Sequence, residues 1–146
     1  MSGEFWAIPL SDGTYACGVV VMAPLRERSA SRVMFLAGLL DWWSPRAPTH
    51  DAIAAAPCLA QAKLHVEGIG FYGGNVLGVL GPGSVPILPW LFRGARMPEN
   101  SHVYLGLSPQ REQRPSDDEL PVISTWGYDF ARLVAERNFG VNPAKS

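Results

Sequence analysis

The chain has 146 residues and a formal net charge of −1, from 12 basic and 13 acidic side chains, and 47% of its residues are hydrophobic. This composition fits one domain with its own core and argues against disorder. It lacks the basic patch that nucleic-acid binding requires, and no apolar run reaches the roughly 18 residues of a membrane span. We therefore expect one globular domain over residues 1–146, with a frayed tail at 141–146, that binds neither nucleic acid nor membrane.

Glycine and proline are abundant, with 15 and 13 copies, which indicates many tight turns and short strands rather than long helices. The two cysteines, Cys17 and Cys58, are too few for a disulfide framework. The sequence also shows no N-terminal signal of basic and then apolar residues. We therefore expect reduced thiols and a cytoplasmic protein.

The first two elements predict a hairpin. Residues 4–10 alternate in hydropathy, as does the run over 15–22, and each predicts a strand. Asp12-Gly13 between them is typical of a tight turn in which both residues have positive φ. Gly18, inside the second strand, indicates a β-bulge or a close approach of another group to the backbone.

The next elements are shorter. A third strand is predicted over residues 32–38. Thr49 is a candidate N-cap for a short helix through Ala56, which Pro57 would end. Residues 62–68 alternate between apolar and polar side chains and predict a further strand.

The chain then becomes rich in glycine and proline. Residues 70–83 contain six glycines, which predict a hairpin or bulged strands with a turn at 81–83. Residues 86–90 are predicted to be extended, because proline blocks both a helix and ladder pairing. Residues 102–107 predict another strand, and the polar residues 108–119 predict an exposed loop.

The C-terminal part predicts a last strand over residues 121–125 and a helix over 127–139. On that helix, Phe130, Leu133, Val134 and Arg137 fall at positions i, i+3, i+4 and i+7. Gly140 follows where a C-terminal cap is expected.

Together these elements predict a β-rich α+β fold, in which a strongly bent antiparallel sheet or a partly open barrel is closed by one C-terminal helix. Trp126 is expected to fill the core just before that helix. The remaining predicted core residues are Trp6, Ile8, Val19, Val21, Phe35, Leu64, Val66, Val103, Leu105 and Leu133.

The sequence predicts no catalytic centre, cofactor or metal site. The glycines within residues 68–73 match the spacing of a dinucleotide-binding loop, but the helix that this function requires does not follow them. His50, His65 and His102 are not at metal-ligand spacing. Cys17 lies in a valine-rich strand and is interpreted as a small core side chain.

Two groups of residues are candidates for binding a partner protein. Asp117, Asp118 and Glu119 form the densest acidic run, which would attract a basic partner or, more simply, belong to a solvated loop. Trp42 and Trp43 are adjacent, so a strand would point them to opposite faces and expose one. Tryptophan is enriched at interface hot spots, although both side chains could instead pack at the core edge. We predict that these five residues contact a partner.

The start of the chain resembles a known family. Phe5-Trp6-Ala7-Ile8-Pro9-Leu10, followed by Asp12-Gly13, Tyr15, Gly18 and Val20, resembles the immunity protein 26 family of bacterial polymorphic toxin systems, and Trp126-Gly127 after Pro121-Val122-Ile123 is similar to a Trp-Gly near the end of its members. The resemblance implies a largely β, cytosolic protein that binds and neutralises a cognate toxin domain. It implies no catalytic residues and no cofactor.

Two other classes of function stay open at this point. One is a small enzyme or ligand-binding barrel whose site assembles from distant residues such as Cys17, a histidine and an aspartate. Rapid alkylation of a low-pKa thiol would indicate the enzyme. The other is a barrel that binds nucleic acid by aromatic stacking, which the near-neutral charge disfavours.

Overall fold

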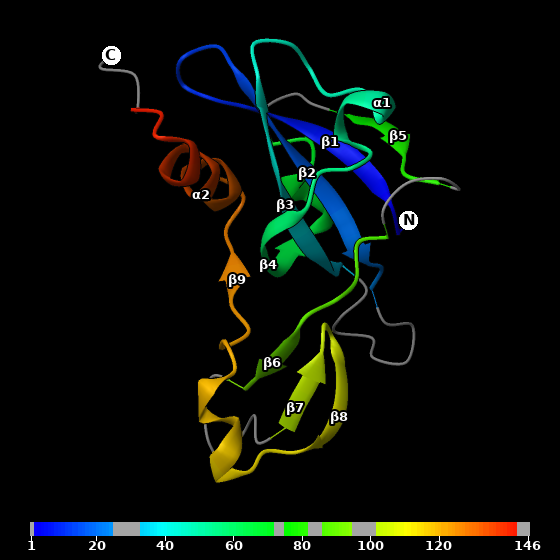
Figure 1. Cartoon of the computed structure of the whole chain (residues 1–146), viewed down its shortest axis with the longest axis vertical. Coiled ribbons are helices and arrows are strands. Elements are labelled where there is room, and N and C mark those ends of the chain that lie inside the picture. Colours follow the sequence, from blue (N-terminus) through cyan, green and yellow to red (C-terminus); the bar gives the residue numbers. More distant parts are fainter. Residues whose placement is uncertain (1, 25–32, 72–74, 82–85, 95–101, 143–146) are drawn as a thin grey trace.

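The computed structural model describes residues 2–24, 33–71, 75–81, 86–94 and 102–142. Its strands form two sheets, in the order β5-β1-β2-β3-β4-β9 and β6-β7-β8, and α2 lies at the opposite end of the molecule from the smaller sheet (Figure 1). The predicted β-rich fold with one main C-terminal helix is confirmed. The larger sheet is not closed into a barrel, and it is mixed because β9 runs parallel to β4.

The strands and helices have the following bounds. The strands are β1 Glu4–Pro9, β2 Tyr15–Met22, β3 Met34–Ser44, β4 Cys58–His65, β5 Val76–Val79, β6 Leu91–Arg93, β7 His102–Leu105, β8 Ser108–Glu112 and β9 Thr125–Trp126. The α-helices are α1 His50–Ile53 and α2 Phe130–Phe139, and two 3-10 helices are η2 Val66–Gly68 and η3 Pro115–Glu119.

The β1–β2 hairpin is confirmed, but its turn differs from the predicted one. Gly13 has a φ of 85°, as predicted. Asp12 does not have a positive φ, since no described residue other than glycine does. The Gly13 N–H donates to the Leu10 carbonyl (3.1 Å), and the Leu10 N–H donates to the Thr14 carbonyl (2.8 Å). This pattern is a three-residue loop that ends in a glycine bulge, so only the glycine needs the left-handed conformation.

Gly18 shows both of the features that its position predicted. The register with β3 shifts between Ala16 and Gly18. The indole of Trp6 lies directly over Gly18, so that an added Cβ would be only 2.3 Å from Trp6 Cζ2. The same indole meets the ring of Phe35 edge-on, with centroids 5.9 Å apart. Glycine is therefore required for Trp6 to reach this packing position.

The third and fourth strands run differently from their predictions. β3 continues to Ser44, past the predicted end at residue 38, because Leu39 and Leu40 are buried on opposite faces as in a central strand. Thr49 caps α1 by accepting from the Ala52 N–H (3.3 Å), but α1 ends at Ile53. β4 ends at His65, and the 3-10 helix η2 takes the place of the last predicted strand residues.

The larger sheet has a hydrophobic cluster on each face. One, which we call the helix face, is covered by α2 and includes Trp6, Ile8, Phe35, Leu64 and Trp126, with Val66 packed at its margin. The other includes Phe5, Cys17, Val19, Val21, Phe92 and Ile123, and the smaller sheet contributes Phe92. Residues 86–90, which we call the strap, contact this second cluster through the side chain of Ile87. We call this side of the sheet the strap face. Val103 of β7 is also buried, as predicted.

The orientation of α2 corrects the predicted helix face. Ala131 and Ala135 are buried against the sheet, whereas Leu133 is only half-buried and Phe130 is exposed beneath the guanidinium of Arg137. Alanine lets the helix backbone come close to the sheet, and this packing outweighs the period of the larger side chains.

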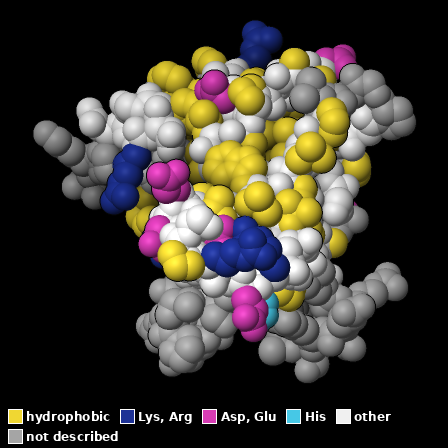
Figure 2. Space-filling model, turned by 60° about the horizontal axis from the view of Figure 1, so that its bottom comes forward, with side chains coloured by type: hydrophobic (Ala, Val, Ile, Leu, Met, Phe, Trp, Pro, Cys, Tyr) yellow, Lys and Arg dark blue, Asp and Glu magenta, His cyan; other side chains and the backbone are white. Residues whose placement is uncertain are grey.

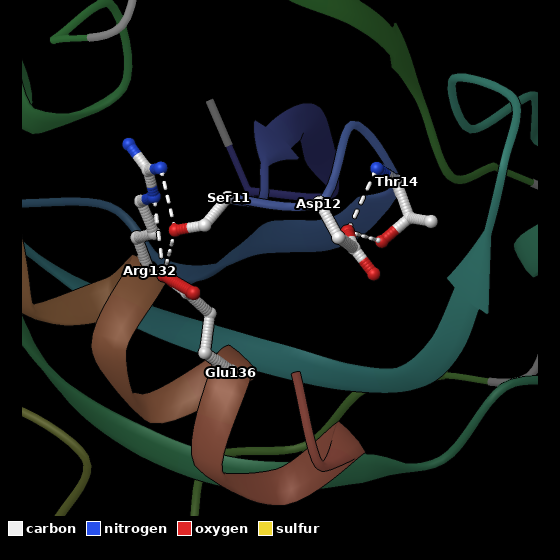
Figure 3. A network of polar contacts seen from close by, with 5 residues as sticks. All are labelled: Ser11, Asp12, Thr14, Arg132 and Glu136. Carbon is white, nitrogen blue, oxygen red and sulfur yellow. Dashed lines mark hydrogen bonds and ion pairs between the residues drawn. The ribbon is translucent and has the colours of Figure 1, made fainter. Parts of the chain in front are cut away.

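A polar network fixes α2 to the β1–β2 turn (Figure 3). Glu136 is buried, and its Oε1 accepts from the Ser11 hydroxyl and from Arg132 Nε, both at 3.1 Å. Arg132 also donates to the Ser11 hydroxyl (2.8 Å). The helix ends at Gly140, which has a φ of 68° and is the predicted cap. Val141 is then buried, so the predicted frayed tail is wrong at this residue, while residues 143–146 lie outside the described part.

Three further predictions need correction. Leu105 is 37% exposed because it lies opposite exposed Leu91 on the outer face of the smaller sheet. The predicted loop over 108–119 contains β8 and η3, and of the predicted strand over 121–125 only Thr125 lies in β9. In the glycine-rich stretch, the described residues form β5 at the edge next to β1, and the register shift between these two strands agrees with the predicted bulged strand. Most of the predicted turn at 81–83 lies outside the described residues.

Candidate functional site

The two predicted tryptophans lie at the end of β3 and point to opposite faces, as expected. Trp42 packs against the strap-face cluster. Trp43 is 47% exposed on the other side, where its ring stacks on Phe139 with centroids 6.0 Å apart. Its Nε1–H donates to the Thr14 hydroxyl (2.6 Å). Trp43 therefore helps to fasten the end of α2 to the β1–β2 turn, although part of its surface is accessible.

The predicted acidic run divides into one structural and two surface carboxylates. Asp117 is buried in η3, and Arg111 binds both of its oxygens at 2.6 Å. The Arg114 backbone N–H donates to the same carboxylate (2.8 Å). These donors, Arg111 first, lower the pKa of Asp117 to about 2. Asp118 and Glu119 are exposed, so only these two can meet a partner directly.

The structure does not bring the two predicted groups together. Figure 1 places the end of β3 at the top of the molecule and η3, between β8 and β9, at the bottom. The two predicted groups therefore lie in different parts of the molecule, and their contact with a partner stays a prediction.

Cys17 lies in the strap-face cluster, as the sequence predicted for a core side chain. Burial raises the pKa of its thiol to about 12. The thiolate that a nucleophile requires is therefore not formed there at neutral pH. Within the described ranges, no group of His, Cys, Asp and Glu is arranged to hold a metal ion.

The sequence analysis missed a candidate site at the strap. Gln61 of β4 is buried, and its side chain holds the strap at two points. Its Nε2 donates to the Leu88 carbonyl and its Oε1 accepts from the Trp90 N–H, both at 2.9 Å. The Trp90 carbonyl in turn accepts from the Gly106 N–H (2.8 Å). One side chain of the larger sheet thus fixes an extended segment that has no ladder of its own.

Beside the strap lies a surface hollow of about 350 Å³, which we call the strap site. Its lining residues are Pro57, Cys58, Pro86, Ile87, Leu88, Pro89 and Trp90. Leu88 is 68% exposed and Trp90 is 37% exposed. Directly after Trp90, exposed Leu91 lies opposite exposed Leu105 across β6 and β7. Figure 2, which brings this end of the molecule forward, shows apolar side chains gathered in one area with charged side chains around them.

A signal for this site was present in the sequence. Residues 86–90 read Pro-Ile-Leu-Pro-Trp, and two prolines in an apolar segment prevent it from joining a sheet on both sides. Apolar side chains that no sheet covers stay at the surface, where they indicate an interaction site. No local pattern indicated that Gln61 would hold the strap, because Gln61 lies 27 residues from Leu88 in the chain.

Comparisons with models of protein families, with curated proteins and with solved structures found no match to this chain. Among the described residues, neither α-helix has the length and hydropathy that crossing a membrane would require.

Proposed function

We propose that this protein is an inhibitor of the immunity type, which neutralises a cognate bacterial toxin domain by docking on it through the strap site. The observation that carries the proposal is the preformed apolar hollow with Leu88 and Trp90 exposed at its wall. Exposed apolar surface of this kind marks protein interaction sites, and tryptophan is among the commonest interface hot spots.

The class of partner comes from the resemblance of the opening residues to the immunity protein 26 family. Those residues form the β1–β2 hairpin, in which Trp6 packs over Gly18 and Gly13 makes the turn. They support the scaffold and do not line the strap site. The resemblance therefore suggests the kind of partner, and the strap site suggests where that partner binds.

The proposed mechanism is occlusion of the toxin's active surface or of its substrate path. A stable complex would bury roughly 1,600 Å² in total, more than the strap site alone provides. The exposed pair Leu91 and Leu105 would extend the contact, and Asp118 and Glu119 would speed encounter with a basic partner. Such a protein acts where the toxin acts, and we propose the cytoplasm, to which the free thiols of Cys17 and Cys58 are suited.

Co-purification from the native organism, followed by an inhibition assay, tests the proposal. We expect a stoichiometric partner that carries a toxin-like domain, and we expect its activity to fall to background when one equivalent of this protein is added. A partner without a toxin domain, or a toxin whose activity does not change, would contradict the proposed function.

A further inference from the structure

The lining of the strap site specifies the chemistry of what it can hold. None of the seven described residues that line it carries a charge. The one titratable group among them is the thiol of Cys58, and burial raises its pKa, so the thiol is neutral at physiological pH. An ionised side chain placed there would lose its hydration and gain no partner.

The hollow has room for one large side chain. Its volume of about 350 Å³ is near the lower limit for small-molecule sites, which span roughly 300–1,000 Å³. Trp90 is part of its wall, and the centroid of its ring lies 6.4 Å from that of the buried ring of Phe92. A planar ring could stack on that wall with little ordering cost.

The strap also offers a backbone group to a partner. Pro86 and Pro89 have no N–H, and the Leu88 carbonyl is already bound to Gln61. The N–H of Leu88 has no hydrogen-bond partner within the described ranges, and this residue is largely exposed. An extended segment running beside the strap could therefore accept a hydrogen bond from Leu88 while a neighbouring side chain enters the hollow.

A second hollow, of about 270 Å³, shares Pro86 and Ile87 with the first. Ser2, Gly3 and Gly81 contribute to its lining, and it has no aromatic wall. Its described lining thus has a serine and two glycines where the strap site has a tryptophan and three prolines. This contrast assigns an aromatic anchor to the strap site and not to its neighbour.

We propose that the strap site takes one uncharged aromatic side chain, presented by an extended segment of the partner protein. This inference rests on the proposed function for the identity of the partner, but the recognition chemistry can be tested on the isolated chain.

The test is an NMR titration of the isolated full-length protein with indole as the probe. We expect saturable shifts at Ile87, Leu88 and Trp90, and binding of indole-3-acetate, which carries a carboxylate, weaker by roughly tenfold or more. Leu88→Glu, at an exposed position where folding is not at risk, should abolish the indole shifts. Cys58→Ser, which places a hydroxyl in the wall, should weaken them. The matched control Trp43→Ala should leave them unchanged.

Shifts at Trp43 and Phe139, or at Gly3 and Leu80 around the second hollow, would overturn the proposal. Equal binding of indole and indole-3-acetate, or an absence of saturable binding, would do the same. Because the probe needs no toxin, these failures are separate from failure of the proposed function, which the inhibition assay reports. A toxin that binds and is inhibited while indole does not bind would leave the immunity function in place and remove only the aromatic anchor.

Discussion

The two faces of the larger sheet are covered in contrasting ways. On the helix face, the small residues Ala131 and Ala135 let α2 close on the sheet, and Ser11, Arg132 and Glu136 lock its position (Figure 3). On the strap face, one glutamine side chain holds an extended segment, and Ile87 of that segment lines two hollows of about 350 and 270 Å³. The contrast suggests that the helix face provides stability and the strap face is available for binding.

The largest expected effect is on the helix face, at Gly18. In Gly18→Val, the new side chain would overlap the indole of Trp6, which lies 2.3 Å from the Cβ position. We expect the free energy of unfolding to fall by about 3 kcal/mol. The new Cβ is fixed to the backbone and the Trp6 ring is buried, so neither can move aside without disturbing the packing. Chemical denaturation measures the change. Gly81→Val is the control, since an added Cβ there meets nothing within 4 Å; equal losses in the two variants would contradict the tight packing at Gly18.

Two substitutions that each enlarge one side chain compare how tightly the two faces of the larger sheet are packed. Ala135→Leu adds volume to a fully buried position under α2 and should cost about 2 kcal/mol of unfolding free energy. Ile87→Phe adds volume at a residue that lines both hollows. It should cost less than about 1 kcal/mol, because the new ring can occupy part of a hollow. Thermal and denaturant unfolding of both variants provide the comparison. If Ile87→Phe proved the more costly, the strap face would be the tighter of the two.

The attachment of the strap is tested by Gln61→Leu. This substitution keeps the approximate shape of the side chain and removes both hydrogen bonds to the strap. We expect a loss of about 1 kcal/mol in stability, together with faster amide exchange at Trp90, whose N–H would lose its acceptor. Gln110→Leu, at an exposed glutamine of β8, is the control. Unchanged exchange at Trp90 would show that other contacts hold the strap.

The smallest effect concerns the pH dependence set by Asp117. Its pKa in the folded protein is about 2, below the ordinary value of 3.8. The ion pair with Arg111 therefore stabilises the fold above pH 3.8, and this contribution is lost as the pH falls from 3.8 through about 2. The stability difference between the wild type and Asp117→Asn should shrink over that interval. Asp118→Asn, at an exposed position, should give a small difference without this step; a constant difference for Asp117→Asn would contradict the pairing.

Local signals carried most of what the sequence could predict about the fold. The hairpin at Gly13, the close approach at Gly18 and the helix end at Gly140 each depend on neighbouring residues, and the structure confirms them. The errors came from packing between distant segments. The buried face of α2 depends on how closely the helix approaches the sheet. Leu105 is exposed because no described segment covers its pairing with Leu91.

The candidate site was harder to predict than the fold. Sequence reasoning grouped Asp117 with its acidic neighbours, but the position of Arg111 on β8 turns that carboxylate inward. Trp42 and Trp43 formed a second predicted group, and the end of β3 that carries them lies at the other end of the molecule from η3 (Figure 1). The strap site combines residues 57–58 with residues 86–90 through Gln61, and no local pattern encodes that combination.

The most direct test of the central claim compares two tryptophans of similar exposure. Trp90 is 37% exposed at the strap site and Trp43 is 47% exposed at the opposite end. Affinity for the identified toxin domain should be measured by calorimetry for Trp90→Ala and Trp43→Ala, after circular dichroism has shown that both variants are folded. The account predicts a loss of about 2 kcal/mol or more in binding free energy for Trp90→Ala and little change for Trp43→Ala. The opposite result would move the binding surface to the end of β3 and contradict the strap site as the docking surface.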